Sequence, residues 1–191
     1  MNQYNAIDLF CGAGGLSYGF ECAGINILLG IDSDQKALEV FERNHKGAKS
    51  ICGDITNINY SDIREKIGNK KIDIIIGGPP CQGFTTAGNR FWNDPRNKLV
   101  QNYAQALAEF QPRWFMMENV EGILTTAKGQ YLVECIKKMI ELGYSVYLKK
   151  VYMQEYGIPQ RRNRVVIVGN RDGKKFLYPP PTQEAAGSLY R

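Results

Sequence analysis

Short apolar segments of strand length alternate with amphipathic helical patterns along most of this 191-residue chain. The expected strands are residues 6–10, 27–31, 50–53, 72–77, 114–118, 145–151 and 164–169. Between several of them, apolar residues recur at the i, i+3, i+4 spacing of a helix face. Three such faces are Ala37, Val40 and Phe41; Leu99, Tyr103, Leu107 and Phe110; and Leu132, Ile136, Met139 and Ile140. This alternation predicts a mostly parallel sheet with helices on both of its faces.

The length of the chain allows one well-packed core and is too short for two full ones. The last two expected strands are separated only by a short basic loop, residues 154–163, so we expect them to pair antiparallel. We therefore predict one doubly wound α/β domain with a seven-stranded, mostly parallel sheet over residues 1–178. Residues 179–191 begin with prolines, which cannot join a helix or a central strand, and are expected to form a linker or tail.

Composition narrows the class of protein further. No segment reaches the apolar length of a membrane span, and the first residues lack the basic and apolar regions of a secretory signal, so we expect a cytoplasmic protein without membrane contact. The five cysteines form an odd set without Cys-x-x-Cys spacing, and the single histidine, His45, is near none of them in sequence. Neither a disulfide framework nor a metal site is expected.

The positive charge is concentrated toward the C-terminus. Residues 1–148 carry a net charge of −1, whereas residues 149–191 carry +6. A basic cluster of this kind is typical of a surface that faces a polyanion such as nucleic acid. A solvated basic face with no partner is the alternative, and charge alone does not separate the two.

Three expected strand ends carry residues suited to a nucleoside. The first strand runs into a glycine-rich turn, where backbone N–H groups can approach a ligand at a helix N-terminus. Acidic residues follow the second and third strands, where they can accept hydrogen bonds from ribose hydroxyls and an adenine amino group. The residues concerned are Phe10, Gly12, Gly14, Gly15, Asp32 and Asp54.

The glycine spacing argues against two common ligands. It is not the Gly-x-Gly-x-x-Gly of dinucleotide binding, and the chain contains no Gly-x-x-x-x-Gly-Lys-Ser/Thr phosphate loop. An adenosine with a tail that lacks phosphate, such as S-adenosylmethionine (SAM), fits better, with Phe10 stacking on the base. The alternative is that these glycines only make a tight turn between strand and helix.

A cysteine follows the fourth expected strand on a stiff loop, Pro79-Pro80-Cys81-Gln82-Gly83. The prolines fix φ and Gly83 permits close approach of a ligand. Because open α/β sheets carry their chemistry at the carboxyl ends of strands, this position favours a nucleophile. For an arbitrary cysteine, a small buried hydrophobic residue beside a turn is the commoner interpretation.

Four motifs together resemble those of one family. They are residues 8–15 (Asp-Leu-Phe-Cys-Gly-Ala-Gly-Gly), 78–84 (Gly-Pro-Pro-Cys-Gln-Gly-Phe), 118–120 (Glu-Asn-Val) and 160–164 (Gln-Arg-Arg-Asn-Arg). In this order the chain resembles the DNA (cytosine-5) methyltransferases, typical of bacterial restriction-modification systems, from about residue 8 to residue 169. The resemblance implies a class I SAM-dependent methyltransferase-like Rossmann fold, SAM as cofactor and double-stranded DNA as substrate.

The resemblance also implies roles for individual residues. Cys81 would add to C6 of cytosine, Glu118 would donate to N3, Arg164 would contact O2 and Arg162 would steady a nearby phosphate. Pro80 would pack against the base extruded from the duplex, while Gln82 and Asn119 would hold the loop and fill the site. The implied SAM contacts are Phe10, Gly12, Gly14, Gly15, Asp32, Asp54 and Leu99. Without the motif, Glu118 would be interpreted as a solvated or salt-bridged residue at a strand end.

The sequence also departs from the family pattern. We expect His45 on an outer helix, where it cannot activate the thiol of Cys81, so cations, backbone dipoles or substrate must do so. After residue 169 nothing resembles the target-recognition region and returning helix of the family, so we expect a fragment, a truncated product or one half of a split enzyme completed by a second chain. Alternatives are a module that only binds SAM or nucleic acid, an enzyme acting on RNA and, more remotely, a nicotinamide oxidoreductase.

Overall fold

A computed structural model describes residues 4–80, 98–125 and 129–182. The strands are β1 (Asn5–Leu9), β2 (Asn26–Asp32), β3 (Lys49–Cys52), β4 (Ile74–Gly77), β5 (Trp114–Val120), β6 (Ser145–Tyr152) and β7 (Asn163–Asn170). The α-helices are α1 (Gly15–Cys22), α2 (Gln35–Asn44), α3 (Tyr60–Lys66), α4 (Lys98–Phe110) and α5 (Gln130–Glu141). Two 3₁₀ turns, η3 (Glu121–Leu124) and η5 (Met153–Tyr156), follow β5 and β6.

All seven predicted strands are present, each within two residues of its predicted ends. They form one sheet in the order β3-β2-β1-β4-β5-β7-β6. The pairs among the first five strands are parallel, whereas β7 runs antiparallel to β5 and to β6, which confirms the predicted pairing of the last two strands. The chain moves outward from β1 to β3 and then returns to β4 beside β1. The crevice at the carboxyl ends of β1 and β4 is therefore the place where such sheets bind ligands.

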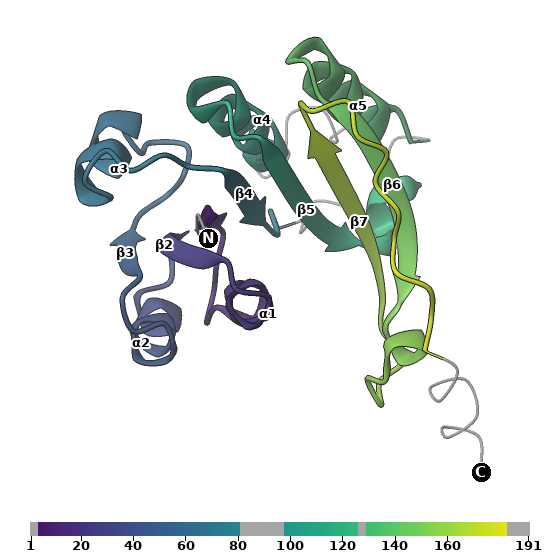
Figure 1. The fold of residues 1–191 in the computed structure, drawn as a ribbon, viewed down its shortest axis with the longest axis horizontal. Helices are drawn as coiled ribbons and strands as arrows, with labels where there is room; N and C mark the ends of the chain where they lie inside the picture. Colours follow the sequence, from purple (N-terminus) through teal and green to yellow (C-terminus); the bar gives the residue numbers. More distant parts are fainter. Residues whose placement is uncertain (1–3, 81–97, 126–128, 183–191) are drawn as a thin grey trace, which may run out of the picture.

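The helices cover the sheet from two sides (Figure 1). On one side α1 and α2 lie together, and on the other α3, α4 and α5 follow the sheet from β3 toward β6. The larger core lies under α3, α4 and α5, and the smaller one lies under α1 and α2, where Leu38 and Phe41 belong to one buried cluster with Ile27 and Ile76. Tyr103 on α4 is fully buried, with its hydroxyl 3.0 Å from the carbonyl oxygens of Ile75 and Met116. The two-sided arrangement confirms the predicted α/β class.

Two of the predicted helix faces are rotated relative to the structure. Helix α2 buries Leu38 and Phe41, whereas Val40 is 41% exposed. Helix α5 buries Leu132, Cys135 and Met139, but Ile140 is 55% exposed. Apolar residues that crowd one stretch of helix fit two neighbouring faces, and only docking on the sheet selects one of them.

His45 was predicted on an outer helix, and it lies one residue beyond such a helix, as the C-cap of α2. It is only 1% exposed, which the prediction did not include. Its ring packs on Phe41 with 4.4 Å between ring centroids. Because the imidazole also has a polar partner on each side, it is buried without leaving a polar atom unsatisfied.

The segment that follows β7 returns along β6 (Figure 1). Tyr178 lies with its hydroxyl 2.9 Å from the carbonyl oxygens of Tyr147 and Val166, and the Tyr156 hydroxyl donates to the carbonyl of Pro179. Thr182 N–H donates to the carbonyl of Glu155. The start of the predicted linker, residues 179–182, therefore contacts η5. None of the helices in the described part of the chain is long and apolar enough to cross a bilayer.

Candidate active site

The turn between β1 and α1 is built from left-handed backbone conformations. The φ angle is 64° at Phe10, 52° at Gly12 and 90° at Gly14. Gly14 also packs closely, because a Cβ added there would lie 2.1 Å from Nε2 of His45. Position 14 therefore requires glycine for two reasons: its φ is positive, and there is no space for a side chain. Gly12 and Gly15 have no atom within 4 Å of such a Cβ, so space remains beside their backbones.

Asp32 ends β2 and holds the glycine turn from its side. Its Oδ2 accepts a hydrogen bond of 2.8 Å from the N–H of Gly12, and its Oδ1 accepts one of 2.9 Å from the N–H of Asp34. Asp34 in turn caps α2 by accepting from the N–H groups of Lys36 and Ala37. One carboxylate therefore joins the ends of β1 and β2.

A first cavity of about 670 Å³ opens at the ends of β1, β2 and β3. It is lined by five of the residues predicted for the site, namely Phe10, Asp32, Asp54, Pro80 and Leu99. Its lining also includes Ser33, Asn57, Asn102 and Gln105, which the sequence did not single out. Asn102 and Gln105 lie on α4. They line the cavity because of the way α4 packs against the sheet, which the local sequence does not show. No lysine or arginine lines this cavity in the described part of the chain.

A second cavity of about 690 Å³ lies on the other side of Phe10. It is lined by four residues of the predicted set, Phe10, Gly15, Glu118 and Arg162. Met153, Ile158 and Gln160, from the connection between β6 and β7, contribute to it as well, and no sequence motif indicated the first two. Phe10 lines both cavities, so the two sites meet at this ring.

Glu118 and Arg164 form an ion pair in the sheet beside the second cavity. Arg164 Nε lies 2.6 Å from Oε1 of Glu118, with side chains 16% and 28% exposed. Glu118 lies on β5, which continues to Val120, two residues beyond its predicted end, and Arg164 lies on β7. The antiparallel register pairs Val120 with Arg164, which brings the two motifs together although they are far apart in sequence. The sequence predicted a role for each residue but not their contact.

A second set of contacts closes the same end of the sheet. Glu121 pairs with Lys150 on β6 and accepts a hydrogen bond of 3.0 Å from the side chain of Asn163. These contacts hold the pKa of Glu121 below its usual value, with the hydrogen bond from Lys150 as the main cause. The Asn163 carbonyl accepts from Nη1 of Arg164 at 2.8 Å. The start of β7 is therefore tied to the segment that follows β5.

The loop after β4 is anchored by Asn119. This side chain is 3% exposed, and its Nδ2 donates a hydrogen bond of 3.0 Å to the carbonyl of Pro79. Pro80 is exposed and lines the first cavity, whereas Gly78 lines the second. The predicted contact of Pro80 with an extruded base stays a prediction, and in the structure Pro80 lines the first cavity. Cys81 and Gln82 lie outside the described residues.

Asp8 on β1 is a buried carboxyl group at the edge of the second cavity. Its Oδ2 accepts a hydrogen bond of 2.7 Å from the hydroxyl of Ser17, and no described residue donates to Oδ1. Burial raises the pKa of Asp8 to about 7. Asp8 begins one of the four motifs but had no predicted role, because its burial depends on how α1 packs against the sheet.

The cysteines of the described part do not resemble activated nucleophiles. Burial raises the pKa of the Cys11 thiol, and it raises that of Cys135 to about 11, so both remain protonated at neutral pH. Cys22 and Cys52 are exposed and, like the other two, free. Among the described residues no group of three or more His, Cys, Asp or Glu side chains could hold a metal ion.

Comparison with known proteins identifies the family. A family model for C-5 cytosine-specific DNA methylases matches residues 4–187. The chain belongs to this family. It is 40% identical to the type II methyltransferase M.AgeI of Thalassovita gelatinovora over 178 residues, which cover 92% of this chain and 42% of that protein. It is 41% identical to M.FnuDI of Fusobacterium nucleatum over 182 residues, covering 93% and 51% of the two chains.

Solved structures agree with the fold. A crystal structure of a prophage-encoded DNA modification methyltransferase of E. coli matches with a TM-score of 0.82 and 30% identity, over 95% of this chain and 51% of that one. S. pombe Dnmt2 matches with a TM-score of 0.73 at 22% identity, over 92% and 52%. The fold of this C-5 cytosine methylase chain is therefore that of the SAM-dependent methyltransferases, and the chain spans about half the length of the curated relatives it matches.

Proposed function

We propose that this C-5 cytosine methylase chain carries the catalytic site that transfers a methyl group from SAM to C5 of cytosine in DNA, in a restriction-modification system, through a covalent bond between Cys81 and C6. The observation that carries the proposal is the pair of cavities that meet at Phe10. One cavity has a lining suited to a nucleoside, and the other carries Glu118 and Arg162 beside the Glu118–Arg164 pair. Gly78 lines the second cavity and Pro80 the first, so the segment that precedes Cys81 in the sequence borders both.

The first cavity fits SAM better than a phosphate-bearing cofactor. Asp32 and Asp54 contribute carboxylates that suit ribose hydroxyls and an amino group, and Phe10 offers an aromatic face to adenine. A lining with two aspartates and no described lysine or arginine disfavours the phosphates of NAD or ATP and suits a ligand with a cationic sulfonium. When bound, SAM supplies the electrophilic methyl group.

The protein must activate the cytosine ring before it can be methylated. C5 of cytosine is a weak nucleophile, and addition of the Cys81 thiolate to C6 forms an S–C6 bond and moves electron density toward C5 and N3. In its protonated form Glu118 donates to N3, and Arg164 donates to O2, so both stabilise the added density. After C5 is methylated, the C5 proton leaves and the S–C6 bond breaks, which restores the aromatic ring.

Access to C6 requires that the target base leave the duplex. The second cavity offers a volume of about 690 Å³ with an apolar wall of Met116, Met153 and Ile158. Arg162 also lies in that cavity, where its guanidinium can contact the phosphate beside the flipped nucleotide. In this proposal the guanidinium groups of Arg162 and Arg164 favour the thiolate of Cys81, so the chain's lone histidine is not needed as its base.

Replacement of Asp32 by alanine is expected to weaken SAM binding by about 1–3 kcal/mol, or roughly 5- to 150-fold. The variant loses the carboxylate proposed to bind ribose and leaves the N–H of Gly12 without its acceptor. Isothermal titration calorimetry on both proteins measures the difference. Asp62→Ala, on the exposed side of α3, is the matched control and should bind SAM as the wild type does. Equal affinities for the wild type and Asp32→Ala would contradict the nucleoside assignment.

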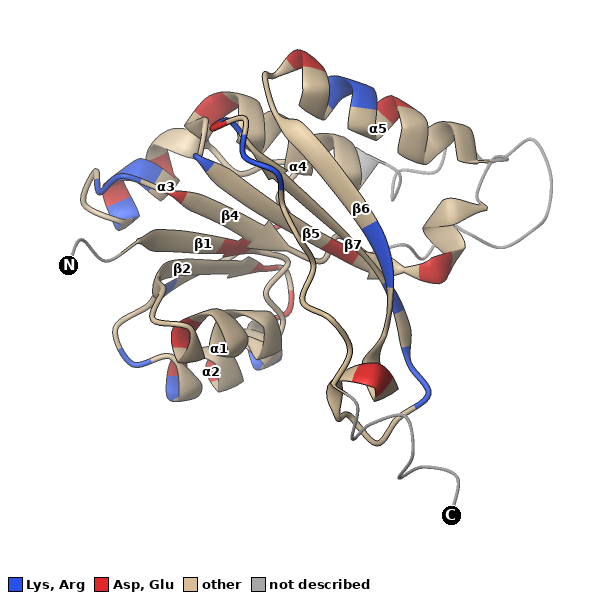
Figure 2. Ribbon diagram, turned by 45° about the vertical axis from the view of Figure 1, so that its right-hand side comes forward, with Lys and Arg blue, Asp and Glu red and all other residues tan. Residues whose placement is uncertain are grey.

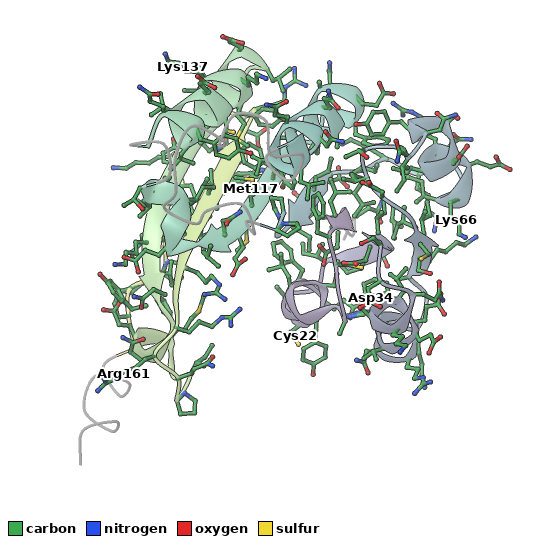
Figure 3. All side chains as sticks on the ribbon, turned by 180° about the vertical axis from the view of Figure 1, so that it is seen from behind. Cys22, Asp34, Lys66, Met117, Lys137 and Arg161 are labelled. Carbon is green, nitrogen blue, oxygen red and sulfur yellow. The ribbon has the colours of Figure 1, made fainter. Side chains whose placement is uncertain are left out.

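DNA binding by this chain is expected to depend steeply on salt and little on sequence. Basic residues gather on β6 and on the loop at its end (Figure 2). Arg161 lies in that loop, far from Lys137, which lies on α5 (Figure 3). Binding through phosphates gives dissociation constants on the order of 10⁻⁴ to 10⁻⁶ M at physiological salt.

The corresponding measurement is a fluorescence anisotropy titration with several DNA duplexes at a series of salt concentrations. Arg161→Gln should lower the slope of log affinity against log salt by about 1, and Lys137→Gln should leave it unchanged. Equal slopes for Arg161→Gln and the wild type would place the DNA elsewhere. Transfer RNA, used as a second probe, should bind no more tightly than DNA, and the reverse result would favour an enzyme acting on RNA.

A further inference from the structure

The single histidine of this chain is buried directly behind the glycine turn of the proposed cofactor site. Its Nδ1 lies 2.7 Å from Oε2 of Glu21 on α1, and its Nε2 lies 3.1 Å from the carbonyl oxygen of Gly14. The imidazole is 1% exposed and Glu21 is 31% exposed. The pair therefore lies at the boundary between a buried turn and solvent.

Both neighbours of the ring are hydrogen-bond acceptors. The Gly14 carbonyl can only accept, and an ionised Glu21 carboxylate can only accept. A neutral imidazole has one N–H and would leave one of these contacts without a proton, whereas an imidazolium donates to both. If the shared proton moves to Glu21, the pair still holds the same number of protons. The geometry therefore requires one proton more than a neutral histidine and an ionised glutamate carry.

The surroundings of the ring favour positive charge. His45 follows the last turn of α2, where the helix dipole stabilises a cation. Asp8 on β1 interacts electrostatically with His45, and Glu21 on α1 contacts it directly. Tyr18 of α1 and His45 line one recess of the surface. Arg43 and Lys46 are the basic residues nearest to His45 in the sequence. Of these groups, Glu21 is the carboxylate in direct contact with the ring and is the acidic partner for an imidazolium.

The Gly14 carbonyl connects this charge to the cofactor turn. The turn is held at Gly12 by Asp32 and at Gly14 by His45, two residues apart and from two different neighbouring segments. The recess that contains His45, of about 470 Å³, is lined by Ala13, Gly14, Gly15, Tyr18 and Asn44 and shares only Gly15 with the two proposed ligand cavities. His45 thus reaches the turn from behind and does not itself line either cavity.

We propose that His45, held as an imidazolium by Glu21, is a positioning residue that fixes the glycine turn for the cofactor. This inference rests on the proposed SAM site. The His45–Gly14 hydrogen bond keeps the left-handed Gly14 in place, so that the backbone between Gly12 and Gly14 is already ordered before the cofactor binds. Binding to an ordered turn avoids the entropic cost of ordering it. Loss of the proton from the pair would leave one donor for two acceptors and remove the charge that strengthens the hydrogen bond to the turn.

The charge of the ring can be measured directly because the chain has a single histidine. In protein labelled with ¹⁵N-histidine, a long-range ¹H–¹⁵N spectrum contains signals from one imidazole only. At neutral pH we expect both ring nitrogens to show the chemical shifts of protonated nitrogen. The Glu21→Gln variant should convert the ring to a neutral tautomer under the same conditions. A neutral ring in the wild-type protein at neutral pH would overturn the proposal.

The positioning role is tested by cofactor affinity together with stability. Glu21→Gln and His45→Gln should each weaken SAM binding by about tenfold or more, since the hydrogen bond to the turn loses its charge in the first variant and its imidazole donor in the second. Glu39→Gln on the exposed side of α2 is the matched control and should leave the affinity unchanged. In the wild type, SAM affinity should fall over the same pH interval in which the NMR signals show loss of the ring proton, and it should not do so in His45→Gln.

The outcomes separate this inference from the proposed function. If the wild type binds SAM and both variants bind equally well, His45 has only a structural role and the inference fails while the function stands. A lower melting temperature with unchanged affinity has the same meaning. If the wild type fails to bind SAM, the proposed function fails and the positioning role with it, whereas the NMR result still reports the charge of the ring.

Discussion

Replacement of Cys81 by alanine should abolish covalent capture of DNA that contains 5-fluorocytosine, while the affinity for SAM and the stability of the fold remain close to wild type. Fluorine at C5 cannot leave as a proton, so an enzyme that has added its thiolate to C6 and methylated C5 stays bonded to the DNA. An alanine has no sulfur with which to form that bond. The adduct is measured by denaturing gel electrophoresis of labelled DNA. The wild type and Cys81→Ala are compared in a form of this enzyme in which the wild type methylates DNA.

A matched cysteine control separates chemistry from packing. Cys22 is exposed on α1 and outside both cavities, so Cys22→Ala should capture DNA as the wild type does. The alternative interpretation of Cys81 as a small buried hydrophobic residue predicts a stability loss of roughly 1–2 kcal/mol and normal capture. Undiminished capture by Cys81→Ala would remove Cys81 from the mechanism and require another nucleophile.

Asp8→Asn is expected to change the pH dependence of stability by on the order of 4 kcal/mol between pH 4 and pH 7. Burial raises the pKa of the Asp8 carboxyl from 3.8 to about 7 in the folded protein. Between these two values the folded state holds a proton that the unfolded state has lost. The free energy of unfolding of the wild type therefore contains a contribution that is largest below pH 4 and declines as the pH rises toward 7.

Asparagine cannot ionise, so the variant lacks this contribution at every pH. It keeps an oxygen that can accept from the Ser17 hydroxyl, so the packing between β1 and α1 is retained. Urea denaturation at several pH values measures both proteins, and the stability of Asp8→Asn relative to the wild type should rise from pH 4 to pH 7. Asp62→Asn, on the exposed side of α3, is the control. A constant difference across this range would show that Asp8 is not held protonated in the folded state.

Much of the fold could be predicted from the sequence because it depends on local periodicity. Apolar runs of strand length and helical spacing reflect contacts made within a few residues, and they gave seven strands with ends within two residues of those observed. The short loop before β7 was enough to predict the antiparallel pair, since a parallel connection needs a longer crossover. The motifs also indicated Phe10, Asp32 and Asp54, whose places at strand ends follow directly from that alternation.

The tertiary structure decided which of these residues meet and what their surroundings do to them. The strand order put β7 between β5 and β6, which brings the side chains of Glu118 and Arg164 into an ion pair although 46 positions separate them in the sequence. Docking of α1 and α2 on the sheet buried Asp8 and His45, which their local sequence had not indicated. Ion pairing, burial and the pKa of a buried carboxyl depend on residues distant in the chain. Local sequence determined the elements of this methylase chain, whereas the charge and contacts of its site arise only when those elements pack.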